Sequence, residues 1–154
     1  MQTFYIVLKF VHVAAVILWL GGVVAVGMLN ARVAHERDPA ALAPLARASR
    51  FFGSAVVGPS ALATLVAGVG MVLASGMSFA TLWIAWGLTG IVIAVLLGTT
   101  LIRSTGEQLG AAMQEGRDGS AGVVRLRQRL RNLSMLNLLV LFSIVAAMVF
   151  KPTL

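Results

Sequence analysis

The chain has 154 residues, of which 59% are hydrophobic and 11% are charged, and its formal net charge is +7. A small water-soluble domain leaves much of its surface wet and cannot bury so many apolar side chains, so lipid must surround most of them. The absence of cysteine excludes disulfides, thiolate metal sites, iron–sulfur clusters and cysteine nucleophiles. Excess arginine in a membrane protein reports topology and anionic headgroups, and we do not expect nucleic-acid binding.

Four apolar stretches are long enough to cross a hydrocarbon core about 30 Å thick, which requires about 20 residues at 1.5 Å each. They are residues 3–29, 51–75, 79–101 and 133–150. The first is long and has neither an early arginine nor an obvious cleavage site, so we interpret it as a retained helix rather than a signal peptide. The sequence therefore predicts an all-α integral membrane four-helix bundle, formed as a single domain over residues 1–154.

Basic residues concentrate in the two longer loops, between spans one and two and between spans three and four. These loops contain Arg32, Arg37, Arg47, Arg50, Arg103, Arg117, Arg125, Arg127, Arg129 and Arg131. The positive-inside rule then predicts two cytoplasmic loops and both termini outside, in a multi-pass protein of a bacterial cytoplasmic membrane. The acidic residues also lie in these loops, so the spans offer no carboxylate for a proton relay or an ion site.

Each cytoplasmic loop contains a segment with helical character. In the first, Asp38 and Pro39 precede a run of alanine and leucine, which predicts a short aspartate-capped helix that we expect along the membrane interface. In the second, residues 123–131 predict an extension of the fourth helix beyond the membrane. We expect its arginines to contact anionic headgroups, and they are Arg125, Arg127, Arg129 and Arg131.

The first span carries an unusual pair, Lys9 and His12, three positions apart and followed by Trp19 at helical spacing. The pair should point together. Lys9 can extend its amine to the headgroups. His12 lies deeper, where a neutral imidazole needs a hydrogen bond from a neighbouring helix or a metal ion, because an unpaired polar group in lipid is costly.

Small and aromatic residues of the other spans lie at the expected depth of His12. They are Gly68, Gly70 and Met71 in the second span, Trp86, Gly87 and Gly90 in the third, and Ala146, Ala147 and Met148 in the fourth. One interpretation is close helix packing, the common use of glycine in membranes. The other is a slot for haem, with His12 as axial ligand and Lys9 as a cation for the propionates. The residues alone leave both open.

The segment KFVHVAAVILWLGG, which contains Lys9, His12 and Trp19, resembles the opening of the HemJ-type membrane protoporphyrinogen oxidases, where a tryptophan follows a first-helix histidine by seven positions. The run GPSALATLVAGVGMVLA from Gly58 resembles the second span of that family, and the VFKP ending resembles its fourth. The resemblance implies a four-helix bundle, homo-oligomerisation, and a haem b bound through the position of His12.

One departure concerns the reaction of that family. Its members have a lysine in the third span shortly after a tryptophan, whereas residues 83–90 here contain none and Gly87 stands about where it would be. The resemblance therefore does not extend to protoporphyrinogen oxidation. The chain also resembles an uncharacterised group of predicted four-helix membrane proteins and, more distantly, the CopD-like copper-associated membrane proteins.

The main hypothesis from the sequence is a haem b or porphyrin protein with a redox or tetrapyrrole-handling role and His12 as iron ligand. The residues expected around the ring are Lys9, Trp19, Gly68, Gly70, Met71, Trp86 and Gly87. Because each chain has one intramembrane histidine, ligation by two imidazoles would require a homodimer. The alternatives are a non-catalytic scaffold or partner subunit, and a copper-handling protein that uses His12 with Met71 or Met148.

Overall fold

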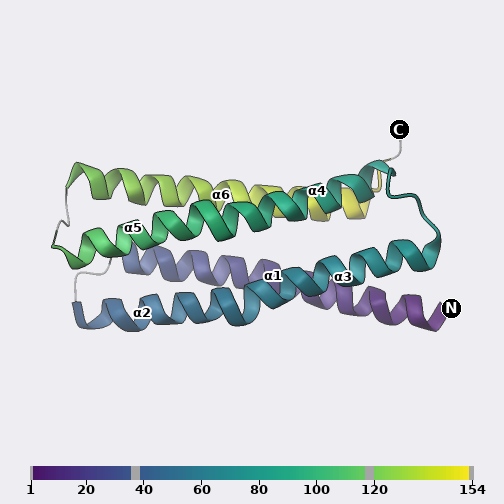
Figure 1. Cartoon of the computed structure of the whole chain (residues 1–154), viewed down its shortest axis with the longest axis horizontal. Helices are drawn as coiled ribbons and strands as arrows, with labels where there is room; N and C mark the ends of the chain where they lie inside the picture. Colours follow the sequence, from purple (N-terminus) through teal and green to yellow (C-terminus); the bar gives the residue numbers. More distant parts are fainter. Residues whose placement is uncertain (1, 36–38, 117–119, 153–154) are drawn as a thin grey trace.

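The protein is described by a computed structural model that covers residues 2–35, 39–116 and 120–152, and these residues form four long helical rods (Figure 1). The first rod is α1 (Gln2–His35) and the fourth is α6 (Ala121–Phe150). The second joins α2 (Pro39–Phe52), the π-helical segment η1 (Gly53–Val57) and α3 (Gly58–Ser75). The third joins α4 (Leu82–Leu96), the π-helical segment η2 (Leu97–Ile102) and α5 (Arg103–Gln114).

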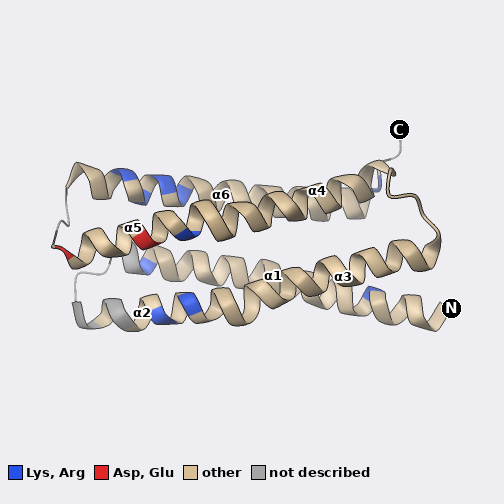
Figure 2. Cartoon of the chain, in the orientation of Figure 1, with Lys and Arg blue, Asp and Glu red and all other residues tan. Residues whose placement is uncertain are grey.

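Each rod contains a stretch that is long and apolar enough to cross a membrane. These stretches are Gln2–Arg32, Pro44–Ser75, Leu82–Gln114 and Ala121–Phe150. The predicted all-α four-helix membrane bundle is confirmed. The rods alternate in direction, so both termini lie at one end of the bundle (Figure 1). Figure 2 shows that the arginines gather at the opposite end, as the predicted topology requires.

The rods are longer than a membrane is thick. The 14, 5 and 18 residues of α2, η1 and α3 together span about 55 Å at 1.5 Å each, compared with about 30 Å of hydrocarbon. The charged end of the bundle therefore extends beyond the lipid as helix rather than as loop.

The prediction of an interfacial helix in the first loop is wrong. Helix α2 lies in line with α3 (Figure 1). It packs along α1, and the Ser49 hydroxyl donates a hydrogen bond to Oδ1 of Asn30 at 2.8 Å. The reason is that α1 continues through His35, well past the apolar span, and gives α2 a protein surface to pack on. The predicted Asp38 cap lies outside the described residues, and the helix begins at Pro39.

The second and third rods each contain a π-helical segment near the charged end of the apolar stretch. In η2, the Thr99 hydroxyl donates to the carbonyl of Val95 at 2.7 Å, four residues earlier. Such bonds bend helices and accompany local π-helical turns. In the second rod, Pro59 lies two residues after the end of η1, and its ring and missing N–H disfavour a regular turn before it. The first and fourth rods are continuous α-helices.

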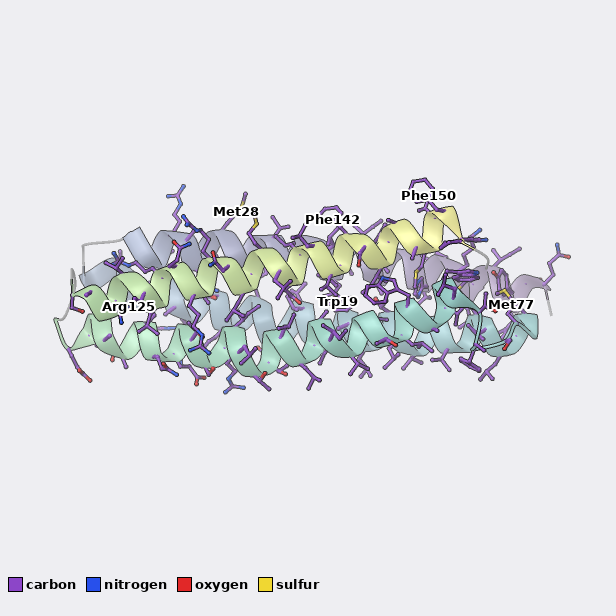
Figure 3. All side chains as sticks on the ribbon, turned by 90° about the horizontal axis from the view of Figure 1, so that it is seen from above. Trp19, Met28, Met77, Arg125, Phe142 and Phe150 are labelled. Carbon is purple, nitrogen blue, oxygen red and sulfur yellow. The ribbon has the colours of Figure 1, made fainter. Side chains whose placement is uncertain are left out.

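The four rods pack as two hairpins. Helix α1 packs mainly on the second rod, and α4 packs mainly on α6, whereas the contacts of α1 with α6 and of α3 with α4 are less extensive. We call the first two rods the N-terminal hairpin and the last two the C-terminal hairpin. Figure 3 shows Trp19 between the helices, while Phe142 and Phe150 point outward from α6 toward lipid.

Two separate groups of buried apolar side chains hold the bundle. The membrane cluster joins both hairpins and consists of Trp19, Ala61, Ile91, Ala94, Leu141 and Ile144. The charged-end cluster lies between α5 and the first half of α6 and consists of Leu109, Ala112, Val123 and Leu130. The second cluster gives the α5–α6 pair a core of its own outside the apolar segments 79–101 and 133–150.

Candidate functional site

His12 is buried between α1 and α3, with 8% of its surface exposed. Its Nδ1 lies 2.9 Å from the backbone carbonyl oxygen of Thr64, and since a carbonyl only accepts, Nδ1 donates the hydrogen bond. In the neutral ring Nε2 then keeps a lone pair, for which the described part of the chain supplies no hydrogen-bond donor. Nδ1 of His12 therefore has the hydrogen-bond partner from a neighbouring helix that the sequence analysis expected.

Lys9 does not share the environment of His12. Residues three positions apart on a helix differ by about 60° around its axis. His12 is directed at α3 and is buried, whereas Lys9 is exposed. An exposed lysine at this depth reaches for the headgroups.

The glycines of α3 receive side chains of α1. A Cβ added to Gly68 would lie 3.1 Å from Cε1 of His12, so the imidazole lies directly on the α3 backbone. A Cβ added to Gly70 would lie 3.2 Å from Cδ1 of Leu8. Both distances are tighter than most real Cβ contacts, so these glycines are needed for the close approach of the two helices.

The glycines of α4 receive side chains of α6 in the same way. A Cβ added to Gly87 would lie 3.0 Å from Cε of Met148, and one added to Gly90 would lie 2.6 Å from Cγ1 of Ile144. Both glycines are buried. In each hairpin, glycines therefore allow the two helices to pack closely. Side chains of the facing helix occupy the space beside these glycines that a haem ring would need.

Between the hairpins lies a cavity of about 20 Å³, with an almost entirely apolar lining. It is lined by Val16, Trp19, Leu20, Thr64, Ile91, Leu141, Ile144, Val145 and Met148. This is room for about one water-sized sphere, but a water needs two or more polar partners. Thr64 offers a hydroxyl oxygen that is buried without a hydrogen-bond partner among the described residues, and the rest of the lining is apolar. The cavity therefore offers a water molecule few polar partners.

The remaining residues expected around a ring do not meet at this cavity. Trp86 is 40% exposed, and its Nε1 donates to the hydroxyl of Ser143 at 3.3 Å on the outer side of the C-terminal hairpin. Met71 is half-buried on α3 and does not line the cavity. Trp83 lies 5.6 Å from Nζ of Lys151, and this cation–π pair belongs to the end that carries the termini, where aromatic residues anchor proteins at the membrane boundary.

Haem does not fit the bundle in this arrangement. Pockets for ligands of that class enclose about 300–1,000 Å³, compared with about 20 Å³ here. The glycines that would admit the ring are occupied by His12, Leu8, Met148 and Ile144. The described residues also contain no group of three histidine or carboxylate side chains that could hold a metal ion. For copper, the methyl group of Met148 packs on Gly87, and no contact places its sulfur against His12.

Sequence reasoning found His12, Trp19 and the glycines but missed their neighbours. The backbone carbonyl of Thr64 has no side-chain signature, and Leu8 and Ile144 look like any other apolar residue in a span. Their roles depend on the register between helices, which the apolar pattern does not fix. Asn137 of the fourth span has a buried Oδ1 without a hydrogen-bond partner in the described part of the chain.

Comparison with known proteins places these features in a family. A family model described as "Predicted integral membrane protein (DUF2269)" matches residues 6–152, a range that includes His12, the packed glycines and both apolar clusters. No curated protein and no solved structure matches the chain. The chain belongs to this DUF2269 family of predicted integral membrane proteins.

Proposed function

We propose that the protein is a non-catalytic membrane scaffold subunit, which holds the α5–α6 helical pair at the membrane surface. The observation that carries this proposal is the filling of Gly68, Gly70, Gly87 and Gly90 by side chains of the facing helix. Glycines used in this way fix two backbones close together and leave no space for a substrate or cofactor.

The charged-end cluster supports the same function. Leu109 and Val123 are 2% and 1% exposed although they lie outside the apolar segments 79–101 and 133–150, which supports packing of α5 and α6 beyond the hydrocarbon. The spans are rigidly joined to this pair, because α6 runs from Ala121 to Phe150 as one helix. A helical pair on a rigid membrane base is suited to positioning a partner rather than to chemistry.

In this proposal His12 is a structural residue that ties α1 to α3 through the Thr64 carbonyl. The test is purification in mild detergent from cells supplied with excess haem and copper, followed by an absorption spectrum and metal analysis. We expect colourless protein without stoichiometric metal, and a lower melting temperature for His12→Ala. A Soret band or one bound metal per chain that disappears in His12→Ala would overturn the scaffold proposal.

The second candidate function is haem b binding, with a redox or tetrapyrrole-handling role. One observation favours it: Nδ1 of His12 donates to a backbone carbonyl, which is the arrangement that orients a metal-ligating imidazole and leaves Nε2 for the metal. Haem would supply redox chemistry when bound, but the two hairpins would have to separate to admit it. The two hairpins contact each other less extensively than the helices within each hairpin do, which supports separation at this interface. The same spectrum decides between the two candidates.

A further inference from the structure

Each of the four rods carries an arginine within three residues of the end of its apolar segment in the sequence, and these segments are residues 3–29, 51–75, 79–101 and 133–150. The arginines are Arg32 on α1, Arg50 on α2, Arg103 on α5 and Arg131 on α6, and we call them the arginine collar. All four side chains are exposed. Figure 2 shows the basic residues of α1, α2, α5 and α6 around the same end of the bundle. The collar is therefore contributed by all four rods toward one end of the bundle and does not follow a single helix.

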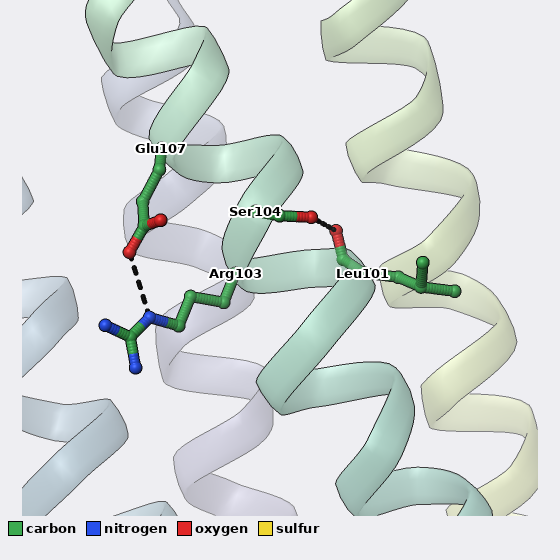
Figure 4. A network of polar contacts seen from close by, with 4 residues as sticks. All are labelled: Leu101, Arg103, Ser104 and Glu107. Carbon is green, nitrogen blue, oxygen red and sulfur yellow. Dashed lines mark hydrogen bonds and ion pairs between the residues drawn. The ribbon is translucent and has the colours of Figure 1, made fainter.

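The collar has little acidic charge to balance it within the described residues. Arg103 pairs with Glu107 through Nε at 2.9 Å, as Figure 4 shows, and both side chains are largely exposed. Arg131 donates to Oε1 of Gln128 at 2.6 Å, which leaves its charge uncompensated. Arg32 and Arg50 have neither an ion pair nor a side-chain hydrogen bond in the described part of the chain. These two are the guanidinium groups most available to an external anion.

Apolar side chains lie directly beside the collar on the membrane side. Phe51, the residue after Arg50, is 63% exposed, and Leu101, two residues before Arg103, is 39% exposed. Exposed apolar groups at this position face acyl chains, so the adjoining guanidinium groups lie at the level of lipid phosphates. Arginine matches phosphate with a fork of N–H donors, which gives directed bonds as well as attraction.

We propose that the arginine collar binds the phosphates of anionic phospholipids, most strongly at Arg32 and Arg50. This inference does not depend on the proposed function. It also relocates the lipid contact predicted for α6: Arg125 lies six residues beyond Arg131, about 9 Å further from the apolar span. That is about one Debye length at physiological salt, so Arg125 contributes little.

The experiment compares single and double variants of equal charge change. Protein is reconstituted in vesicles with equal amounts of phosphatidylglycerol and phosphatidylcholine, and the lipids retained after detergent release are counted by native mass spectrometry. Wild-type protein should retain more phosphatidylglycerol. We expect Arg50→Gln to lower the ratio of the two lipids by about fivefold, and Arg32→Gln with Arg50→Gln by more. The matched control Arg125→Gln should leave the ratio near that of wild type.

Three outcomes would overturn the proposal. They are equal retention of both lipids by wild-type protein, an equal loss in Arg125→Gln, and displacement of phosphatidylglycerol by inorganic phosphate, which would indicate a site for free anions. Helix content measured by circular dichroism confirms that each variant is folded. Should Arg50→Gln not fold, Arg32→Gln alone carries the same prediction, because Arg32 is also exposed and without a side-chain partner among the described residues.

Discussion

The membrane cluster and the charged-end cluster are buried to the same degree but are stabilised differently. Leu141 in the first is 4% exposed and Leu109 in the second is 2% exposed. Around Leu109, packing removes apolar surface from water and contributes about 25 cal/mol per Å². Around Leu141, the alternative to packing is lipid, which is equally apolar, so van der Waals fit and interhelical hydrogen bonds must hold the helices together. Equal burial therefore does not mean equal stabilisation.

Truncating the two leucines tests this difference directly. We expect Leu109→Ala to destabilise the α5–α6 pair by about 2–5 kcal/mol, because it loses both transfer free energy and packing. Leu141→Ala should cost clearly less, because only the packing contribution is lost. The measurement is thermal unfolding of purified protein in one detergent, followed by circular dichroism. A control, Val124→Ala, removes a side chain that is 56% exposed and should change little.

Equal costs for the two leucine variants would contradict the comparison. They would mean that the charged end is as well shielded from water as the membrane cluster, and that the rods do not extend beyond the lipid.

The glycines that pack against side chains of a facing helix should be sensitive to the addition of a single methyl group. Gly90→Ala introduces a Cβ 2.6 Å from Ile144, and we expect it to cost about 1–3 kcal/mol by separating α4 from α6. Gly21→Ala is the matched control, since nothing lies within 4 Å of its added Cβ. It should be neutral or slightly stabilising, because alanine favours helix more than glycine does. Thermal unfolding measures the stability of both variants. A similar loss of stability in the two would argue against close packing of α4 and α6 at Gly90.

The contact between His12 and Gly68 can be isolated by a double-mutant cycle. Gly68→Ala alone should destabilise, since its Cβ would lie 3.1 Å from the imidazole. In the His12→Ala background the ring is gone, and the same substitution should cost little. We expect a coupling free energy of roughly 1 kcal/mol between the two sites, measured by thermal unfolding. Additive effects would show that the imidazole is not held against α3.

The smallest expected effect is at the start of α6. Ser120 accepts a hydrogen bond from the Val123 amide at 3.3 Å and caps the helix. Ser120→Ala should cost about 0.5–1 kcal/mol and loosen the charged-end cluster only, because the cap lies one turn from Val123. Hydrogen exchange of the residue 121–130 amides should increase, while that of the residue 133–150 amides should not. Faster exchange along all of α6 would contradict two separate clusters.

The sequence predicted the features that depend on whether each side chain prefers lipid or water. Four apolar stretches and the arginines beside them could be read directly, and the helical continuation through Arg125 and Arg131 was expected and is present. It did not predict that α2 continues α3, because that depends on α1 being long enough to pack against. The sequence identified residues of the candidate site but not how they are arranged. Lys9 and Trp86 are exposed, whereas His12 and Trp19 are buried.

By itself the sequence determined that this chain is a membrane protein and which end of the bundle carries the charge. Both conclusions depend on the properties of single residues, namely their hydrophobicity and the positions of the arginines. Only the tertiary structure decided what His12 touches and what occupies the glycine faces. Those contacts depend on the rotation and register of one helix against another. In lipid, where every apolar face is equally well solvated, that register is selected by close packing, and a list of apolar residues does not encode it.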